Sequence, residues 1–151
     1  MEEETKEVLR IIDHKERVAN YIVHIAHELL NRSVNHDSTK LQKENIGPSL
    51  EGTKLLHGVE YGSEQYKETL KKIKPNIDNH YAHNSHHPEH YPNGINDMSI
   101  IDIIEMLCDW KAATARHPNG NMPESFEINQ KRFNISPQLI KIFKNTLKYI
   151  E

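Results

Sequence analysis

Apolar residues recur every three or four positions through the N-terminal part of the chain. The series comprises Val8, Ile11, Val18, Ile22, Ile25 and Leu29. This spacing is typical of one face of an amphipathic helix, and it predicts a helix over residues 7–30. His14 falls in the same series, so its ring is predicted to face the core. His24 and His27 fall on or beside the polar face and are predicted to be solvated.

The rest of the sequence predicts further helices separated by turns. A short helix is expected over residues 37–45 and is expected to end at Gly47-Pro48. The glycine-containing residues 48–63 are expected to form a loop. Later helices are expected over residues 63–74, 100–116 and 125–131, and a last one begins at residue 136.

Three serines are predicted to cap these helices. Ser63 and Ser136 each precede an expected helix, and Ser99 is followed three positions later by Asp102, as in a capping box. Asp102 itself is predicted to lie on a solvated acidic face. Because no segment shows sustained alternation of apolar and polar residues, the sequence predicts an all-α protein. We expect a single domain over residues 1–151.

Length and composition narrow the class of protein. The chain has 151 residues, 36% of them hydrophobic, and a formal net charge of −3. One core is expected at this length, and the nearly balanced charge argues against stable DNA binding. A single cysteine excludes an intramolecular disulfide, and neither a signal peptide nor a membrane-spanning apolar run is evident. We therefore expect a cytoplasmic protein without membrane association, and homo-oligomerisation stays open.

Histidine is over-represented and unevenly distributed. The chain has 11 histidines, and five of them lie within eleven residues, namely His80, His83, His86, His87 and His90. Their spacing would put several on one side of a helical turn, which favours a metal site. His80 and His83 are expected to face the same cavity. A solvated polar loop and an adventitious metal patch are the alternatives.

A second histidine feature is the pair His36-Asp37. An imidazole nitrogen and a carboxylate oxygen from adjacent residues can both reach a metal ion, and the carboxylate can bridge two ions. The pair is followed by Ser38-Thr39-Lys40. The whole string resembles the His-Asp-x-x-Lys signature of the HD-domain metal-dependent phosphohydrolases. In that resemblance, His14 matches the earlier histidine and Asp109 the distant aspartate of the family.

The middle of the chain extends the resemblance to the HD-GYP subgroup of this family. The matching features are His86-His87-Pro88-Glu89, Tyr91-Pro92-Asn93-Gly94 and the later Arg116, although His90 stands where the subgroup has glycine. The metal ligands that the resemblance implies are His14, His36, Asp37, His86, His87 and Asp109. His57 matches a further ligand, or else it is an ordinary loop residue. His80 and His83 are candidate ligands from their spacing.

The resemblance implies a helical domain with a central metal site, its motifs spanning residues 14–118 and residues 119–151 packed against them. It implies one or two divalent cations (Mn, Fe, Co, Ni, Zn or Mg) that activate water to cleave a nucleotide or cyclic nucleotide phosphoester. Asp37 is the expected bridging ligand, and Lys40 and Arg116 are expected to hold the phosphate.

Two other functions fit the same residues. One is a protein that binds or sequesters a nucleotide without cleaving it, and the other is a di-iron oxygenase of the HD type. The string from His80 to Tyr91 also resembles a family of small phage and bacterial proteins, which supplies no activity. If a phage encodes the chain, we expect it in the host cytoplasm.

Overall fold

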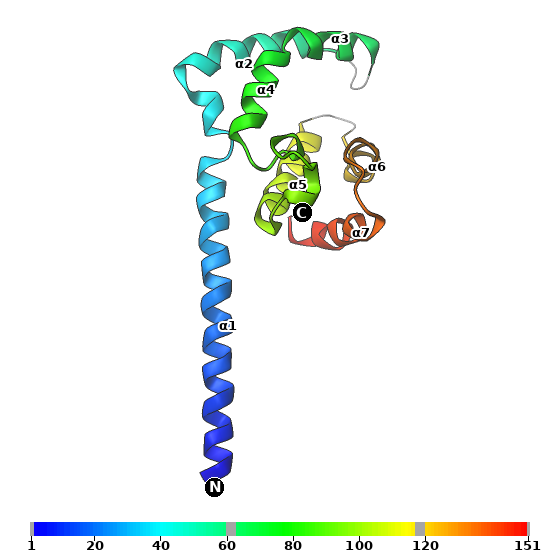
Figure 1. Ribbon diagram of the computed structural model, residues 1–151. Coiled ribbons are helices and arrows are strands. Elements are labelled where there is room, and N and C mark those ends of the chain that lie inside the picture. The colour runs from blue at the N-terminus through cyan, green and yellow to red at the C-terminus, as the bar shows by residue number, and fades with distance from the viewer. Residues whose placement is uncertain (1, 60–62, 117–119, 151) are drawn as a thin grey trace. The chain divides into compact units, whose positions relative to one another are not determined.

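The computed structural model describes residues 2–59, 63–116 and 120–150 (Figure 1). This described part of the chain contains seven α-helices, four short 3₁₀-helices and no strand, which confirms the all-α prediction. None of the described helices combines the length and the apolar character needed to cross a membrane. The chain forms two compact units, residues 1–36 and residues 37–151.

The first unit consists of one long helix, α1 (Glu2–Asn35). It extends beyond the predicted residues 7–30 at both ends. Its first turn carries three glutamates, which the positive end of the helix dipole stabilises. Ion pairs one turn apart, such as Arg17–Asp13 at 2.9 Å, line its polar surface. None of the described residues of α1 is buried, and His14, His24 and His27 are all exposed.

The second unit contains the other ten elements. They are η1 (Ser38–Leu41), α2 (Lys43–Leu56), α3 (Glu64–Lys72), α4 (Lys74–His83), η2 (Pro88–His90), η3 (Gly94–Asp97), α5 (Ile100–Ala115), α6 (Met122–Phe133), α7 (Pro137–Thr146) and η4 (Leu147–Tyr149). Helices α2, α3 and α4 contact one another, and η1 contacts both α2 and α4. Helix α5 contacts α6, and η2 contacts α4.

The expectation that Gly47-Pro48 ends a helix is wrong, because α2 continues through this pair to Leu56. Proline disfavours a helical conformation in the preceding residue by colliding with its N–H and Cβ. That preceding residue is Gly47, which has no Cβ, so the collision is smaller. Pro48 lies in the second turn of α2, where it removes one backbone hydrogen bond. Much of the expected loop over residues 48–63 is helix instead.

The predicted helix over residues 63–74 is present, but the chain does not stop being helical after it. Ser63 caps α3 as predicted, accepting a hydrogen bond from the backbone N–H of Tyr66 at 3.1 Å. Pro75 then falls in the first turn of α4, where a missing N–H costs little. As a result α4 carries the first part of the histidine-rich segment, up to His83.

The later caps also follow the sequence prediction. Ser99 and Asp102 form a complete capping box at the start of α5. Ser136 caps α7 by accepting a hydrogen bond from the backbone N–H of Leu139. Helix α6 begins earlier than the expected residue 125, because Asn121 caps it and accepts a hydrogen bond from the N–H of Glu124.

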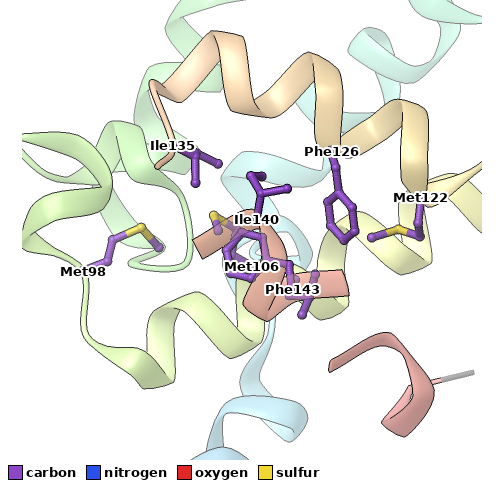
Figure 2. Close-up of a cluster of buried hydrophobic side chains, with 8 residues drawn as sticks. Met98, Met106, Met122, Phe126, Ile135, Ile140 and Phe143 are labelled. Atoms are coloured by element: carbon purple, nitrogen blue, oxygen red, sulfur yellow. The ribbon is translucent and has the colours of Figure 1, made fainter. Parts of the chain in front are cut away.

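A hydrophobic core joins α5, α6 and α7 (Figure 2). Phe126 and Phe143 lie at its centre, each 1% exposed, with ring centroids 6.0 Å apart. Met106 is equally buried, and Ile135 packs on the same cluster from the turn after α6. This core leaves the opposite face of α5 available for polar contacts with the segment that follows α4.

Candidate metal centre

Four side chains of the second unit converge on one point. Asp37, His80, His86 and His87 each offer one nitrogen or oxygen atom, and these four atoms all lie within 4.8 Å of one another. Asp37 Oδ1 lies 3.3 Å from His80 Nε2 and 3.5 Å from His86 Nε2. We refer to these four residues as the histidine cluster. Three imidazoles and one carboxylate make a donor set that suits a first-row divalent metal.

Asp37 enters the cluster in an uncommon backbone conformation. Its φ of 54° and ψ of 14° lie in the left-handed region, which aspartate tolerates better than most residues. The residue directly precedes η1, and its second carboxylate oxygen lies 2.6 Å from Lys40 Nζ. Asp37 therefore presents one oxygen to the histidines and the other to the ammonium group of Lys40. A backbone held in this region often marks a functional position.

Glu105 on α5 orients His86. His86 is 2% exposed, and its Nδ1 atom lies 3.1 Å from Glu105 Oε1. A carboxylate at this distance favours the proton on Nδ1, which leaves the lone pair on Nε2 pointing into the cluster. Metal-binding histidines are commonly held this way, by a carboxylate on the ring nitrogen that does not bind the metal.

His80 and His87 contact each other directly. Their Nε2 atoms lie 2.8 Å apart, a distance that requires a proton on one of them. The side-chain amide of Asn84 lies 3.0 Å from His80 Nδ1 and donates to the backbone carbonyl of His80. If the amide also donates to His80 Nδ1, the shared proton lies on His80 Nε2 and His87 Nε2 is the acceptor. A metal ion bound by both nitrogens would displace that proton.

His87 stays neutral over the ordinary pH range. Its pKa is lowered from the usual 6.5 to about 2, mainly by burial and also by neighbouring His86 and His80. The negative charge of Asp37 opposes this shift but does not overcome it. A neutral imidazole retains the lone pair that a metal requires.

Asp102 anchors the segment that carries His86 and His87. Its carboxylate accepts hydrogen bonds from Ser85 Oγ at 2.7 Å, from Tyr91 Oη at 3.0 Å and from Ser99 at the start of α5. The prediction that Asp102 is solvated is wrong, since it is only 2% exposed. Its burial is tolerated because three hydroxyl groups donate hydrogen bonds to its oxygens. The hydrogen bonds from Ser85 and Tyr91 fix the two ends of residues 85–91 to α5.

A cavity of about 330 Å³ adjoins the histidine cluster. His80 and His87 belong both to the cluster and to the cavity wall, and Lys40 lines the cavity as well. The other walls come from α2 and α4. A small molecule in this cavity would therefore contact the cluster directly.

The remaining sequence-predicted residues fall outside the cluster. His14 and His36 belong to the first unit, where His36 directly precedes Asp37. His57 is an exposed residue at the end of α2, and His83 is exposed on α4 with its ring nitrogen 2.8 Å from the carbonyl of Asn79. His14, His36, His57 and His83 stay predictions as ligands.

Asp109 and Arg116 lie on α5 and at its C-terminal end. Asp109 shares a face of the helix with Asp102 and Glu105, one turn beyond Glu105. Arg116 is exposed. A metal role for Asp109 and a phosphate role for Arg116 stay predictions. The spacing of Asp102, Glu105 and Asp109 on one face was visible in the sequence, whereas the burial of Asp102 and the contact of Glu105 with His86 were not.

Comparison with known proteins adds a family but no activity. The sequence pattern of a family of unknown function, DUF5662, matches residues 3–149. Searches of curated proteins and of solved structures gave no match. Because the match covers nearly the whole sequence, the chain belongs to the DUF5662 family.

Proposed function

We propose that the protein is a metal-dependent phosphohydrolase that binds a divalent cation at Asp37, His80, His86 and His87. The observation that carries the proposal is the convergence of these four donor atoms within 4.8 Å, at the wall of a cavity that also contains a lysine. Nitrogen-rich sites of this kind suit Zn, Fe, Mn, Co or Ni better than Mg, which prefers oxygen ligands.

The surrounding residues fit the needs of a metal site. Glu105 holds a proton on His86 Nδ1, and burial keeps His87 neutral, so both rings have a lone pair for the metal. Asp37 supplies the anionic ligand. The hydrogen bonds of Asp102 fix the backbone of residues 85–91, so that two of the three imidazoles are positioned before a metal binds.

A bound cation at this site supplies a water of lowered pKa and stabilises charge on the phosphoryl oxygens. The chain's own contribution is binding and orientation. Lys40 is a fixed positive charge beside Asp37 and lines the cavity, so its ammonium group is suited to hold a phosphate oxygen. Arg116 stays a second predicted phosphate contact, and His14, His36 and Asp109 stay predicted metal ligands.

The first test measures metal content and phosphate release. Purified protein is stripped with a chelator, reloaded separately with Mn²⁺, Fe²⁺, Co²⁺, Zn²⁺ or Mg²⁺, and assayed with p-nitrophenyl phosphate, nucleoside monophosphates and cyclic nucleotides. We expect about one tightly bound ion and hydrolysis with at least one metal. His86→Ala and Asp37→Asn are expected to lose both.

His24→Ala is the matched control, because it removes an exposed histidine on the polar face of α1 that is not a predicted ligand. It is expected to retain metal and activity. Equal metal content in wild type, His86→Ala and Asp37→Asn would refute the metal site. A metal-loaded protein that binds a nucleotide tightly and returns it unchanged would instead identify a binding protein.

A further inference from the structure

We infer that the cavity between α2 and α4 binds the uncharged body of a small phosphomonoester, with its phosphate at Lys40 and its apolar end near Leu56 and Ile73. This inference rests on the proposed function, because it assigns the substrate class of the same site. Four observations support it: the helical faces that form the walls, their change in polarity, their charge and the cavity's size.

Two helices contribute regularly spaced residues to the cavity. The lining residues of α2 include Asn45, Ser49, Gly52 and Leu56, at intervals of three or four positions. Those of α4 and its N-cap include Ile73, Ile77 and His80, with the same spacing. Each set forms one face of its helix. The cavity is therefore a feature of the packing of these two helices.

The two ends of the cavity can be told apart from contacts between its walls. Asn79 Nδ2 donates to Asn45 Oδ1 at 3.3 Å, next to His80 and the histidine cluster. Gly52 lies at the other end, where a Cβ added to it would be 3.4 Å from Ile73 Cδ1. Asn45 and Gly52 are seven residues apart on α2, which corresponds to about 10 Å along the helix axis.

The polarity of the walls changes along this length. Residues at the cluster end offer hydroxyl, amide and imidazole groups, including Thr39, Asn45 and His80. Residues at the far end offer the apolar surfaces of Gly52, Leu56 and Ile73, with the polar side chains of Thr53 and Asn76 beside them. A ligand that matches both ends has hydrogen-bonding groups next to its phosphate and an apolar or flat group at its opposite end.

Charge and size define the ligand further. Among the described residues that line the cavity, Lys40 is the only one with a permanent charge, and none is acidic. A charged group at the far end would have no counter-ion in this lining, so the body should be neutral. A volume of about 330 Å³ is at the lower end of the range for ligand pockets, which fits one nucleoside-sized body. A nucleoside monophosphate and a short alkyl or aryl phosphate share this chemistry.

The test measures binding to the metal-free protein, so that it does not depend on catalysis. Isothermal titration calorimetry is performed with inorganic phosphate, adenosine 5′-monophosphate, phenyl phosphate and hexyl phosphate. We expect at least one organic phosphate to bind ten times more tightly than inorganic phosphate. The adenosine and hexyl compounds distinguish a nucleoside body from an alkyl body.

Leu56→Trp fills the far end of the cavity. It is expected to weaken the binding of the organic phosphates at least tenfold and to leave the affinity for inorganic phosphate unchanged. Leu55→Trp is the matched control, since Leu55 is the adjacent residue, is 41% exposed and does not line the cavity. It should change neither affinity. Ser49→Phe provides a second filling variant, and circular dichroism checks that each variant is folded.

The inference is overturned if the organic phosphates bind no better than inorganic phosphate, or if both filling variants retain wild-type affinity for them. Either result concerns the cavity alone and does not bear on the proposed metal site. Conversely, a protein that holds no metal and hydrolyses no phosphoester refutes the proposed function, while the effect of Leu56→Trp on organic phosphates still decides the role of the cavity.

Discussion

The hydrophobic core of α5–α7 is buried and the histidine cluster is half-buried around His86, and different forces hold the two regions together. Phe126, Phe143 and their neighbours are stabilised by removing apolar surface from water, which depends little on pH or ions. The histidine cluster buries polar groups, whose desolvation must be offset by hydrogen bonds, by charge partners or by a metal. Its stability should therefore respond to protons and metal ions.

Helix α5 connects the two regions. Met106 and Leu107 belong to the hydrophobic core, whereas Asp102 and Glu105 hold the segment that carries His86. One helix thus uses one face for packing and the other for positioning. A substitution in one region should therefore disturb that region and leave the other in place.

The largest expected effect is the loss of a core ring. Phe126→Ala removes a side chain that is 1% exposed and leaves a cavity beside Phe143, which should lower the free energy of unfolding by about 3–5 kcal/mol. Urea unfolding of the metal-free protein measures this loss. Metal affinity, measured where the variant is still folded, should stay within about twofold of wild type. A large fall in affinity would mean that the two regions are coupled through α5.

The second prediction concerns pH and applies to the metal-free protein. Because the pKa of His87 is lowered to about 2 in the folded state and is near 6.5 when unfolded, the unfolded state takes up a proton that the folded state does not. Above pH 6.5 His87 is neutral in both states, so it imposes no proton-linked penalty on folding. As the pH falls from 6.5 towards 2, protonation of the unfolded state lowers the free energy of unfolding by up to about 1.4 kcal/mol per pH unit.

Urea unfolding at pH 7, 6 and 5 in the presence of a chelator measures this dependence. His87→Gln removes the titrating group, so its free energy of unfolding should fall less steeply with decreasing pH. His83→Gln, which removes an exposed histidine, should follow the wild-type slope. Identical slopes for wild type and His87→Gln would show that His87 is not the group responsible.

The sequence predicted those parts of the fold that depend on local chemistry. The caps at Ser63, Ser99 and Ser136 are local, because each hydroxyl bonds to a backbone N–H three residues ahead. The course of α2 was missed because Pro48 normally signals an end, and the glycine before it makes continuation less costly. The local signals at Gly47-Pro48 conflict, and a local sequence pattern cannot reveal the contacts of α2 with α3 and α4.

The candidate site was recovered only in part. His80 came from helical spacing and Asp37 from its adjacency to His36, while a family resemblance selected His86 and His87 within the histidine-rich segment. Asp102 and Glu105 were not assigned to it, because an acidic residue on a helix has the same local pattern whether it faces water or a buried histidine. Only the docking of residues 85–91 on α5 distinguishes the two cases.

The third prediction tests Glu105 as a positioning residue. Glu105→Gln keeps the shape of the side chain but removes the charge beside His86 Nδ1, and it should weaken metal binding about 10–100-fold. The control is Glu89→Gln, which removes a carboxylate within residues 85–91 that pairs with Arg132 at 2.6 Å and not with a histidine of the cluster. Competition with a fluorescent chelator measures both affinities. Equal weakening in the two variants would indicate general loosening of the segment.

The smallest expected effect comes from two helix caps that differ in one respect. Ser136→Ala and Ser99→Ala each remove a hydroxyl that accepts a hydrogen bond from a backbone N–H, and each should lower the free energy of unfolding by about 1 kcal/mol. Ser99 also donates to Asp102 at 2.6 Å, and Asp102 anchors both ends of residues 85–91. Within the described residues, the cap at Ser136 has no such link to Asp102.

We therefore expect Ser136→Ala to leave metal affinity unchanged and Ser99→Ala to weaken it several-fold. Chemical denaturation gives the stability of each variant, and chelator competition gives its metal affinity. Tyr91→Phe provides an independent check, because it removes another hydrogen bond to Asp102 without touching a helix cap. If Ser99→Ala and Tyr91→Phe both retain wild-type metal affinity, then the anchoring of residues 85–91 by Asp102 serves the fold alone.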